Sequence, residues 1–168
     1  MKNLTKFILI LCLCLCFVGC GMSRLFKKEN NISKMTSFSF SYTEPMAGRF
    51  TVDINKTDDG VLFIYESYFE LDSPGYHLES EISLDDDIFA DITAVCEKYD
   101  ISSWDGFSSK ASPGTLDGDS FSLRIDFSDS EEGLRAGGSG GKPKNFNEFY
   151  DEIYELVSII AREHPQNN

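Results

Sequence analysis

The sequence is poor in histidine, tryptophan and positive charge. It has two histidines, one tryptophan and 15 basic residues against 28 acidic residues. The two histidines do not have the spacing of zinc ligands, and no G-x-S-x-G nucleophile elbow occurs. The net charge of −13 opposes binding to nucleic acid and to anionic lipid head groups. These absences weigh against a zinc enzyme, a serine hydrolase of that type and a nucleic-acid-binding protein.

The N-terminal segment has the composition of an export signal. A basic start with Lys2 and Lys6 precedes an apolar run over residues 7–18, FILILCLCLCFV. This run is too short to span a bilayer, which takes about 20 residues. The segment therefore predicts a secretory signal peptide.

The end of the apolar run resembles the lipobox of bacterial lipoproteins. Residues 17–20 read FVGC, with Phe17 where leucine is usual, Gly19 as the small residue and Cys20 as the cysteine that receives lipid. The resemblance implies lipid on the Cys20 thiol, cleavage before Cys20 and acylation of the new amino group, with fatty acids such as palmitate. Two or more acyl chains make a stable anchor, so we expect an extracytoplasmic protein held on the bacterial cell membrane. An uncleaved signal anchor, or a signal cut elsewhere, is the alternative.

These features divide the chain into four parts. We expect a signal peptide over residues 1–19, a lipidated N-terminus and tether over residues 20–35, a single domain over residues 36–164 and a disordered tail over residues 165–168. Loss of the signal removes two lysines and no acid, so the net charge falls from −13 to −15. With Cys20 lipidated, Cys96 is the remaining thiol, which excludes an intramolecular disulfide. Cys96 lies on the apolar side of an expected helix, which predicts a buried and unreactive thiol.

Alternating apolar residues predict four consecutive strands at the start of the domain. They cover residues 37–42, 49–55, 61–71 and 76–84. A period of two is typical of a half-buried strand, and the short turns between the strands indicate an antiparallel meander. The third strand also carries Leu62 and Ile64 on its second face.

Two segments with a helical period follow the strands. Residues 83–100 place Ile88, Ile92, Val95 and Tyr99 on one face, and residues 146–163 do the same with Phe149, Ile153, Leu156 and Ile160. Between them we expect a strand over residues 120–127, a short strand over residues 134–136, and Trp104 and Phe107 as core residues. The order ββββαββα predicts an α+β domain of two layers, an antiparallel sheet of about six strands with both helices on one face.

A glycine-rich segment before the second helix raises the question of a phosphate-binding loop. Gly141 and Lys142 fit the P-loop pattern, but Ala136 and Pro143 stand where it requires glycine and serine or threonine. The segment therefore predicts a joint that permits positive φ, with Asn145 as the helix N-cap and Glu148 at the third helical position as in a capping box.

The acidic clusters do not match a calcium loop. Asp85, Asp86 and Asp87 are adjacent, and a helix would point them in different directions. The pair Asp117 and Asp119, and the group Asp53, Asn55 and Asp58, lack the remaining ligands and the distal glutamate. We expect turns and caps there, and neither a metal nor a cofactor, although a weak exposed calcium site stays open.

The C-terminal third resembles a pattern found in uncharacterised lipoproteins of clostridia-like bacteria. The segments that carry it are SSWDGF, then LDGDSFSLRIDFSD, then GLRAGGSGGKPKNFNEFYDEI. In that pattern a tryptophan segment precedes a D-G-x-S-F-S-L strand, a short strand, a glycine-rich turn and a terminal helix. The resemblance implies an α+β fold and an exported bacterial setting, and it implies no site residue.

Our hypothesis is a non-enzymatic lipoprotein that binds an envelope protein or ligand, as a monomer, through the solvent side of its sheet. An ordinary solvated face is the alternative reading of that side. The candidate face comprises Arg49, Thr51, Asp53, Leu62, Ile64, His77, Glu79, Glu81, Arg124 and Asp126. The alternative function is an envelope hydrolase with paired carboxylates, with or without calcium. A pocket that groups carboxylates of raised pKa would favour the hydrolase.

Overall fold

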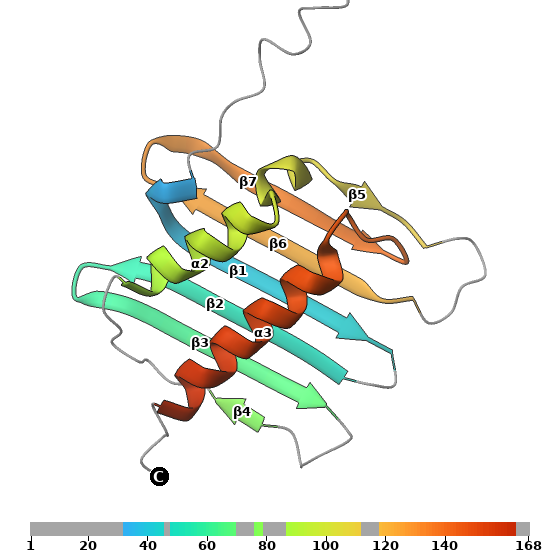
Figure 1. The fold of residues 1–168 in the computed structure, drawn as a ribbon, viewed down its shortest axis with the longest axis horizontal. Coiled ribbons are helices and arrows are strands. Elements are labelled where there is room, and N and C mark those ends of the chain that lie inside the picture. Colours follow the sequence, from blue (N-terminus) through green and yellow to red (C-terminus); the bar gives the residue numbers. More distant parts are fainter. Residues whose placement is uncertain (1–31, 46–47, 70–75, 79–86, 112–117, 164–168) are drawn as a thin grey trace, which may run out of the picture.

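The computed structural model describes residues 32–45, 48–69, 76–78, 87–111 and 118–163 (Figure 1). The predicted signal peptide, most of the tether and the tail lie outside these residues. No helix in the described part of the chain combines the length and the apolar character that a membrane span requires.

In the described part of the chain, seven strands form one sheet in the order β4-β3-β2-β1-β6-β7-β5. Their bounds are β1 Met35–Glu44, β2 Gly48–Thr57, β3 Gly60–Phe69, β4 Tyr76–Leu78, β5 Ser108–Ser109, β6 Ser120–Phe127 and β7 Ser130–Ser139. Neighbouring strands are antiparallel except β5 and β7, which are parallel. The pairing of β1 with β6 joins the N-terminal meander to the C-terminal hairpin.

Two helices cover one face of this sheet. Helix α2 spans Asp87–Lys98 and helix α3 spans Phe146–Glu163, and Figure 1 shows both in front of the strands. Two short 3-10 helices, η2 at Ile32–Lys34 and η3 at Ile101–Trp104, precede β1 and follow α2. The predicted two-layer α+β fold is confirmed, with a mixed sheet in place of a purely antiparallel one.

The strand register explains why the helices settle on this face. Phe38, Phe40 and Tyr42 of β1 lie opposite apolar residues of both neighbours, Ile54, Val52 and Phe50 on β2 and Ile125, Leu123 and Phe121 on β6. All nine side chains are buried. Side chains of successive residues alternate between the two faces of a strand, so these three strands present continuous apolar rows to the helices.

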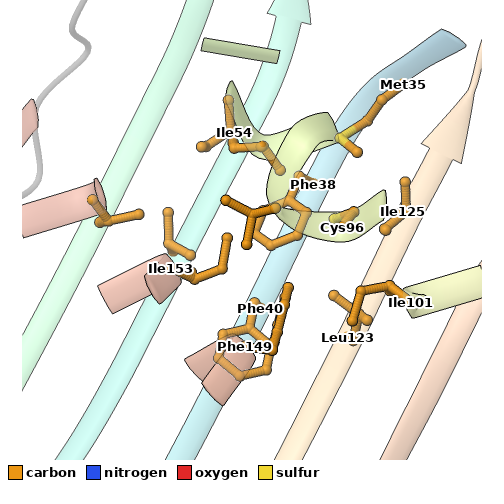
Figure 2. Close-up of a cluster of buried hydrophobic side chains, with 14 of the residues drawn as sticks. Met35, Phe38, Phe40, Ile54, Cys96, Ile101, Leu123, Ile125, Phe149 and Ile153 are labelled. Atoms are coloured by element: carbon orange, nitrogen blue, oxygen red, sulfur yellow. The ribbon is translucent and has the colours of Figure 1, made fainter. Parts of the chain in front are cut away.

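The helices complete the core with aromatic and aliphatic side chains. Figure 2 shows Phe149 and Ile153 of α3 and Cys96 of α2 directed at the β1 residues Phe38 and Phe40. The rings of Phe40 and Phe149 meet edge to face with centroids 5.4 Å apart, a geometry that aromatic pairs favour. The layers are therefore held together by large side chains from both.

Trp104 fills the space between η3 and the start of α3. Its ring is stacked on Phe146 at a centroid distance of 5.9 Å and meets Phe149 at 5.1 Å. Its indole N–H donates a hydrogen bond to the Lys144 carbonyl oxygen at 3.1 Å, which satisfies the polar atom that burial would otherwise strand. Phe107 packs partly buried against the same core. Both predictions of core residues in this segment are confirmed.

The outer edge of β7 is covered by the segment that leads into β5. The Asp105 carboxylate accepts the Arg135 backbone N–H at 3.1 Å, and the Gly106 N–H donates to the Arg135 carbonyl oxygen at 2.8 Å. The Gly137 N–H donates to the Phe107 carbonyl oxygen at 3.0 Å. These bonds satisfy backbone groups that an edge strand would otherwise expose.

Three boundaries differ from the prediction. The tether was expected to run to residue 35, but Ile32 and Met35 are 7 % and 5 % exposed and belong to the core, because the η2 turn places residues three apart on one side. Strand β7 covers Ser130–Ser139 instead of residues 134–136, since glycines and charged residues hide its alternation. The two-residue β5 has no sequence pattern at all.

The apolar stripe of α3 also differs from the prediction. Phe149 and Ile153 are buried as expected, but Val157 and Ala161 complete the buried face, while Leu156 and Ile160 are partly buried beside it. The stripe follows a spacing of four residues along the helix. The small apolar side chain of Ala161 does not stand out in the sequence pattern, although it is buried.

Candidate functional site

The second face of the sheet carries most of the residues predicted for binding. Arg49, Thr51 and Asp53 on β2 alternate with the buried Phe50, Val52 and Ile54, so they point away from the helices. The same alternation puts Leu62 and Ile64 of β3 and Arg124 and Asp126 of β6 on this face. We call it the open face, because both helices lie on the other side (Figure 1).

Three of the predicted residues belong to β4 and to the segment that follows it. The backbone of His77 pairs with Glu66 in β4. Glu79 and Glu81 lie outside the described residues. The predicted strand over residues 76–84 is described as far as Leu78.

The register separates the remaining residues into two groups. Arg49 and Thr51 are linked by a hydrogen bond of 3.1 Å from Nε to Oγ1 on β2. Arg124 and Asp126 are linked on β6, and β1 runs between these two strands. Strands lie about 4.8 Å apart, so the two groups are separated by roughly 10 Å.

Short hydroxyl side chains fill the centre of the open face. Ser37, Ser39 and Ser41 of β1 lie between β2 and β6, with Ser39 opposite both Asp53 and Arg124. Ser122 of β6 lies opposite Ser41 on one side and Gly137 of β7 on the other. The middle of the open face therefore carries short polar side chains, and the charged side chains lie on either side of it.

Arg124, Asp126 and Arg135 form an ionic cluster on β6 and β7. The Asp126 carboxylate accepts hydrogen bonds from Arg124 Nε at 3.0 Å and from Arg135 Nη2 at 2.5 Å. Partial burial acts to raise the pKa of Asp126, but the hydrogen bonds and charges of the two arginines outweigh it and hold that pKa below its ordinary value. Arg135 is absent from the predicted binding face, although it lies in the short strand predicted over residues 134–136.

A shallow hollow adjoins this cluster at the β5 end of the sheet. It has a volume of about 710 Å³, and its lining includes Lys110, Arg124, Arg135, Ser122, Gly137 and Ser139. Gly137 lies in the floor of the hollow and has no side chain to fill it. An added Cβ there would meet the Phe121 carbonyl oxygen at 3.3 Å and the Ser122 Cα at 4.0 Å. Among the described residues that line the hollow, three are positively charged and none is negatively charged.

The glycine-rich segment gives Lys142 a structural role. The Lys142 ammonium lies 2.7 Å from Asp119 Oδ2 and donates a hydrogen bond of 2.8 Å to the Tyr42 hydroxyl, which itself donates to Asp119 at 2.9 Å. Gly140 has a φ of 73°, a left-handed conformation that suits glycine, and its N–H donates to the Asp119 carbonyl oxygen at 2.8 Å. The segment thus ties β1 and the start of β6 to the end of β7.

The three members of this cluster have shifted pKa values. Hydrogen bonding to Lys142 is the main influence on the pKa of Asp119 and holds it low. Burial acts to lower the pKa of Lys142, but hydrogen bonds with Asp119 and Tyr42 raise it overall. Burial raises the pKa of Tyr42. The cluster is an ion pair between Lys142 and Asp119 with a protonated Tyr42 hydroxyl beside it. This arrangement fits a role in stabilising the fold.

Asn145 occupies the predicted N-cap position of α3, since its carbonyl oxygen accepts the Phe149 N–H at 3.1 Å. Its φ of 62° lies in the left-handed region, whereas an ordinary N-cap residue has an extended backbone. Asparagine tolerates this region better than most residues.

The acids and the thiol of the described residues are not gathered into a metal-binding cluster. No group of three or more histidine, cysteine, aspartate or glutamate residues in this part of the chain is placed to hold a metal ion. The carboxyl groups with clearly shifted pKa values, Asp119, Asp126 and Glu152, all shift downward. Cys96 is fully buried, as predicted, and burial raises its pKa to about 12.

A scan against protein-family models found no matching family, and a search of curated proteins found no match.

Proposed function

We propose that the protein is a lipid-anchored extracytoplasmic lipoprotein whose domain binds an envelope component through its open face. The lipobox-like FVGC at residues 17–20 and the apolar run before it support the anchor and the location. The observation that carries the binding role is the contrast between the two faces of the sheet. One face is closed by α2 and α3, and the other displays polar residues in the middle and charged groups on either side.

The open face differs from an ordinary solvated surface in the size of its side chains. The middle strand, β1, presents Ser37, Ser39 and Ser41 on this face, and each of them is half-buried between the neighbouring strands. Short side chains leave hydroxyl groups within reach of a flat partner, whereas long solvated side chains would hold it away. The half-buried Leu62 and Ile64 on β3 add apolar contact area beside them.

The envelope hydrolase with paired carboxylates gains no support from the described residues. The carboxylates of Asp119 and Asp126 are each held by cations and have lowered pKa values, which suits ion pairing and not proton donation near neutral pH. The described residues therefore favour the binding role over the hydrolase.

The anchor is tested by metabolic labelling with an alkynyl fatty acid, followed by mass analysis of the N-terminal peptide. We expect wild-type protein to carry acyl groups on Cys20 and to fractionate with the membrane. The Cys20→Ala variant should lose both the label and the membrane association. An N-terminus without acyl groups in the wild type would overturn the proposed location.

The binding face is tested by photo-crosslinking in intact cells. A photoreactive residue at Thr51 on the open face is compared with one at Glu155, an exposed position on α3. We expect one defined crosslinked product from position 51, competed by added free domain, and none from position 155. Equal products from both positions would contradict the assignment of binding to the open face.

A further inference from the structure

We propose that the hollow between β5, β6 and β7 binds a phosphate monoester carried on a group of about the size of a sugar. This inference rests on the proposed binding role of the open face and names the chemistry of one ligand. The residues that carry it are Lys110, Arg124, Arg135 and the serines around Gly137.

The charge of the hollow runs against the charge of the chain. The sequence has 28 acidic and 15 basic residues, yet the described lining of the hollow contains Lys110, Arg124 and Arg135 and no acid. The Asp126 carboxylate beside it is shared by both arginines, and the Asp105 carboxylate binds the Arg135 backbone at the strand edge. Repulsion from the distant acids is screened beyond about 10 Å at 0.1 M salt, so the charge of the hollow is set by its three cations together with the Asp126 and Asp105 carboxylates beside it.

Arg124 and Arg135 lie opposite each other, and a bound anion would reduce the repulsion between their positive charges. Arg124 and Arg135 are direct cross-strand partners in the β6–β7 ladder. Like charges at directly opposed positions destabilise a sheet, and one shared carboxylate compensates for one of the two charges. The Arg124 guanidinium uses its Nε for Asp126, and within the described residues its two terminal nitrogens have no recorded partner. They remain as donors for a ligand.

The number and origin of the cations favour phosphate over carboxylate. Lys110 follows β5, Arg124 lies on β6 and Arg135 on β7, so positive charge reaches the hollow from three separate segments. A carboxylate has two oxygens in one plane, whereas a phosphate monoester has three oxygens that diverge and carries a charge of about −1.5 to −2 at pH 7. Lys110 and the terminal nitrogens of Arg124 can reach different phosphate oxygens, whereas the Arg135 guanidinium, held by the Asp126 carboxylate and by the Ile125 and Leu134 carbonyl oxygens, contributes its charge.

The size and floor of the hollow indicate the rest of the ligand. The hollow is shallow and open to solvent, and its volume of about 710 Å³ exceeds what a bare oxyanion fills, so a bound phosphate leaves room for a group attached to it. Gly137 leaves the floor without a side chain, and Ser122 and Ser139 flank it on the open face. A flat floor ringed by hydroxyls suits a ring that carries its own hydroxyl groups, such as a sugar.

The test is isothermal titration of the full protein, purified from producing cells in mild detergent, with glucose 6-phosphate as the probe. Glucose, inorganic phosphate and glucuronate at matched ionic strength are the comparison ligands. We expect saturable binding of glucose 6-phosphate with an affinity at least about tenfold higher than that of each comparison ligand. Equal binding of inorganic phosphate or glucuronate, or no saturable binding of the probe, would overturn the proposal.

Variants localise the site. Arg124→Glu and Lys110→Glu should each weaken binding of the probe by about tenfold or more, because each replaces a cation of the hollow by an acid. Arg49→Glu makes the same charge change on the open face outside the hollow, and Arg162→Glu makes it at the end of α3; both should stay within about twofold of wild type. Uniform weakening by all four variants would show a general charge effect and refute the site.

These results are separable from the test of the proposed function. Titration of the purified protein does not depend on acylation of Cys20, so failure of the anchor leaves the result for the hollow unchanged. Failure of glucose 6-phosphate to bind, with crosslinking from position 51 intact, would remove the ligand assignment and leave the binding face in place.

Discussion

Tyr42→Phe is a direct measure of how the glycine-rich segment is fixed to the sheet. The Tyr42 side chain is 5 % exposed, and its hydroxyl contacts both Lys142 Nζ at 2.8 Å and Asp119 Oδ2 at 2.9 Å. Phenylalanine keeps the ring contacts with Phe146 and Tyr150, so the change removes the hydroxyl and leaves the packing. Hydrogen bonds to charged groups contribute about 1.5 to 3 kcal/mol.

The partial exposure of the two charged partners reduces this figure. The side chains of Lys142 and Asp119 are 29 % and 35 % exposed, so water can replace part of what the phenol provides. We expect Tyr42→Phe to lower the free energy of unfolding by about 1.5 kcal/mol, measured by urea denaturation followed by Trp104 fluorescence. A matched control is Tyr150→Phe, since the structure records no hydrogen bond for the Tyr150 hydroxyl within the described residues. That variant should change the free energy of unfolding by less than about 0.5 kcal/mol.

The same cluster makes a prediction about pH. The folded-state pKa of Asp119 lies below its ordinary value, so its pairing with Lys142 stabilises the fold above the unfolded pKa, about 3.9, and this contribution is lost as the pH falls through the folded value. A double-mutant cycle of Asp119→Asn and Lys142→Met should therefore give a favourable coupling at pH 7 that disappears at strongly acidic pH. Equal destabilisation by Tyr42→Phe and Tyr150→Phe, or a coupling that persists unchanged in acid, would refute this account.

Three further outcomes follow from individual residues. The Cys96 thiol should not react with Ellman's reagent at pH 8 until denaturant is added, because it is fully buried and its pKa is raised to about 12. Gly133→Ala should lower the free energy of unfolding by about 2 kcal/mol or more in urea denaturation, since the added Cβ would collide with the Ile125 carbonyl oxygen and the Arg135 guanidinium. Trp104→Phe should lower it by about 1 to 2 kcal/mol, measured by circular dichroism because the variant has no tryptophan, through loss of the indole hydrogen bond and of packing.

The parts of the fold that follow a regular period could be predicted from the sequence. The residues Phe38, Phe40 and Tyr42 alternate so strictly that strand β1 and its buried face follow from the order of the residues alone. The helix over residues 146–163 has the bounds of α3, because its apolar stripe is long and it is preceded by Pro143 and Asn145. Local patterns of this kind report which face of an element is buried.

The parts that depend on contacts between distant residues could not be predicted. Strand β5 exists because Ser108 and Ser109 meet Gly137 and Gly138 across a parallel pairing, and nothing in the serine pair itself indicates a strand. The burial of Ile32 depends on its contact with α2, where Thr93 Oγ1 donates to the Ile32 carbonyl oxygen at 3.4 Å.

Some residues of the candidate site could be predicted from local patterns, and others could not. Alternation correctly places Arg124 and Asp126 on the open face. Lys110 and Arg135 join them through the pairing of β6, β7 and β5, which no local pattern encodes. The sequence signal for this site is a cation opposite another cation in a predicted hairpin, because such a pair costs stability unless an anion lies near it.

The hydrogen bonds along the margin of β7 limit how this protein can meet other chains. Between residues 135 and 137 the main chain already has partners in Asp105, Gly106 and Phe107, so an incoming strand finds no donors or acceptors to copy. With copies anchored as proposed, the high local concentration on a membrane would make strand-to-strand polymerisation a hazard for a domain with an uncapped sheet edge. This capped margin disfavours strand-to-strand pairing between copies of the domain along residues 135–137.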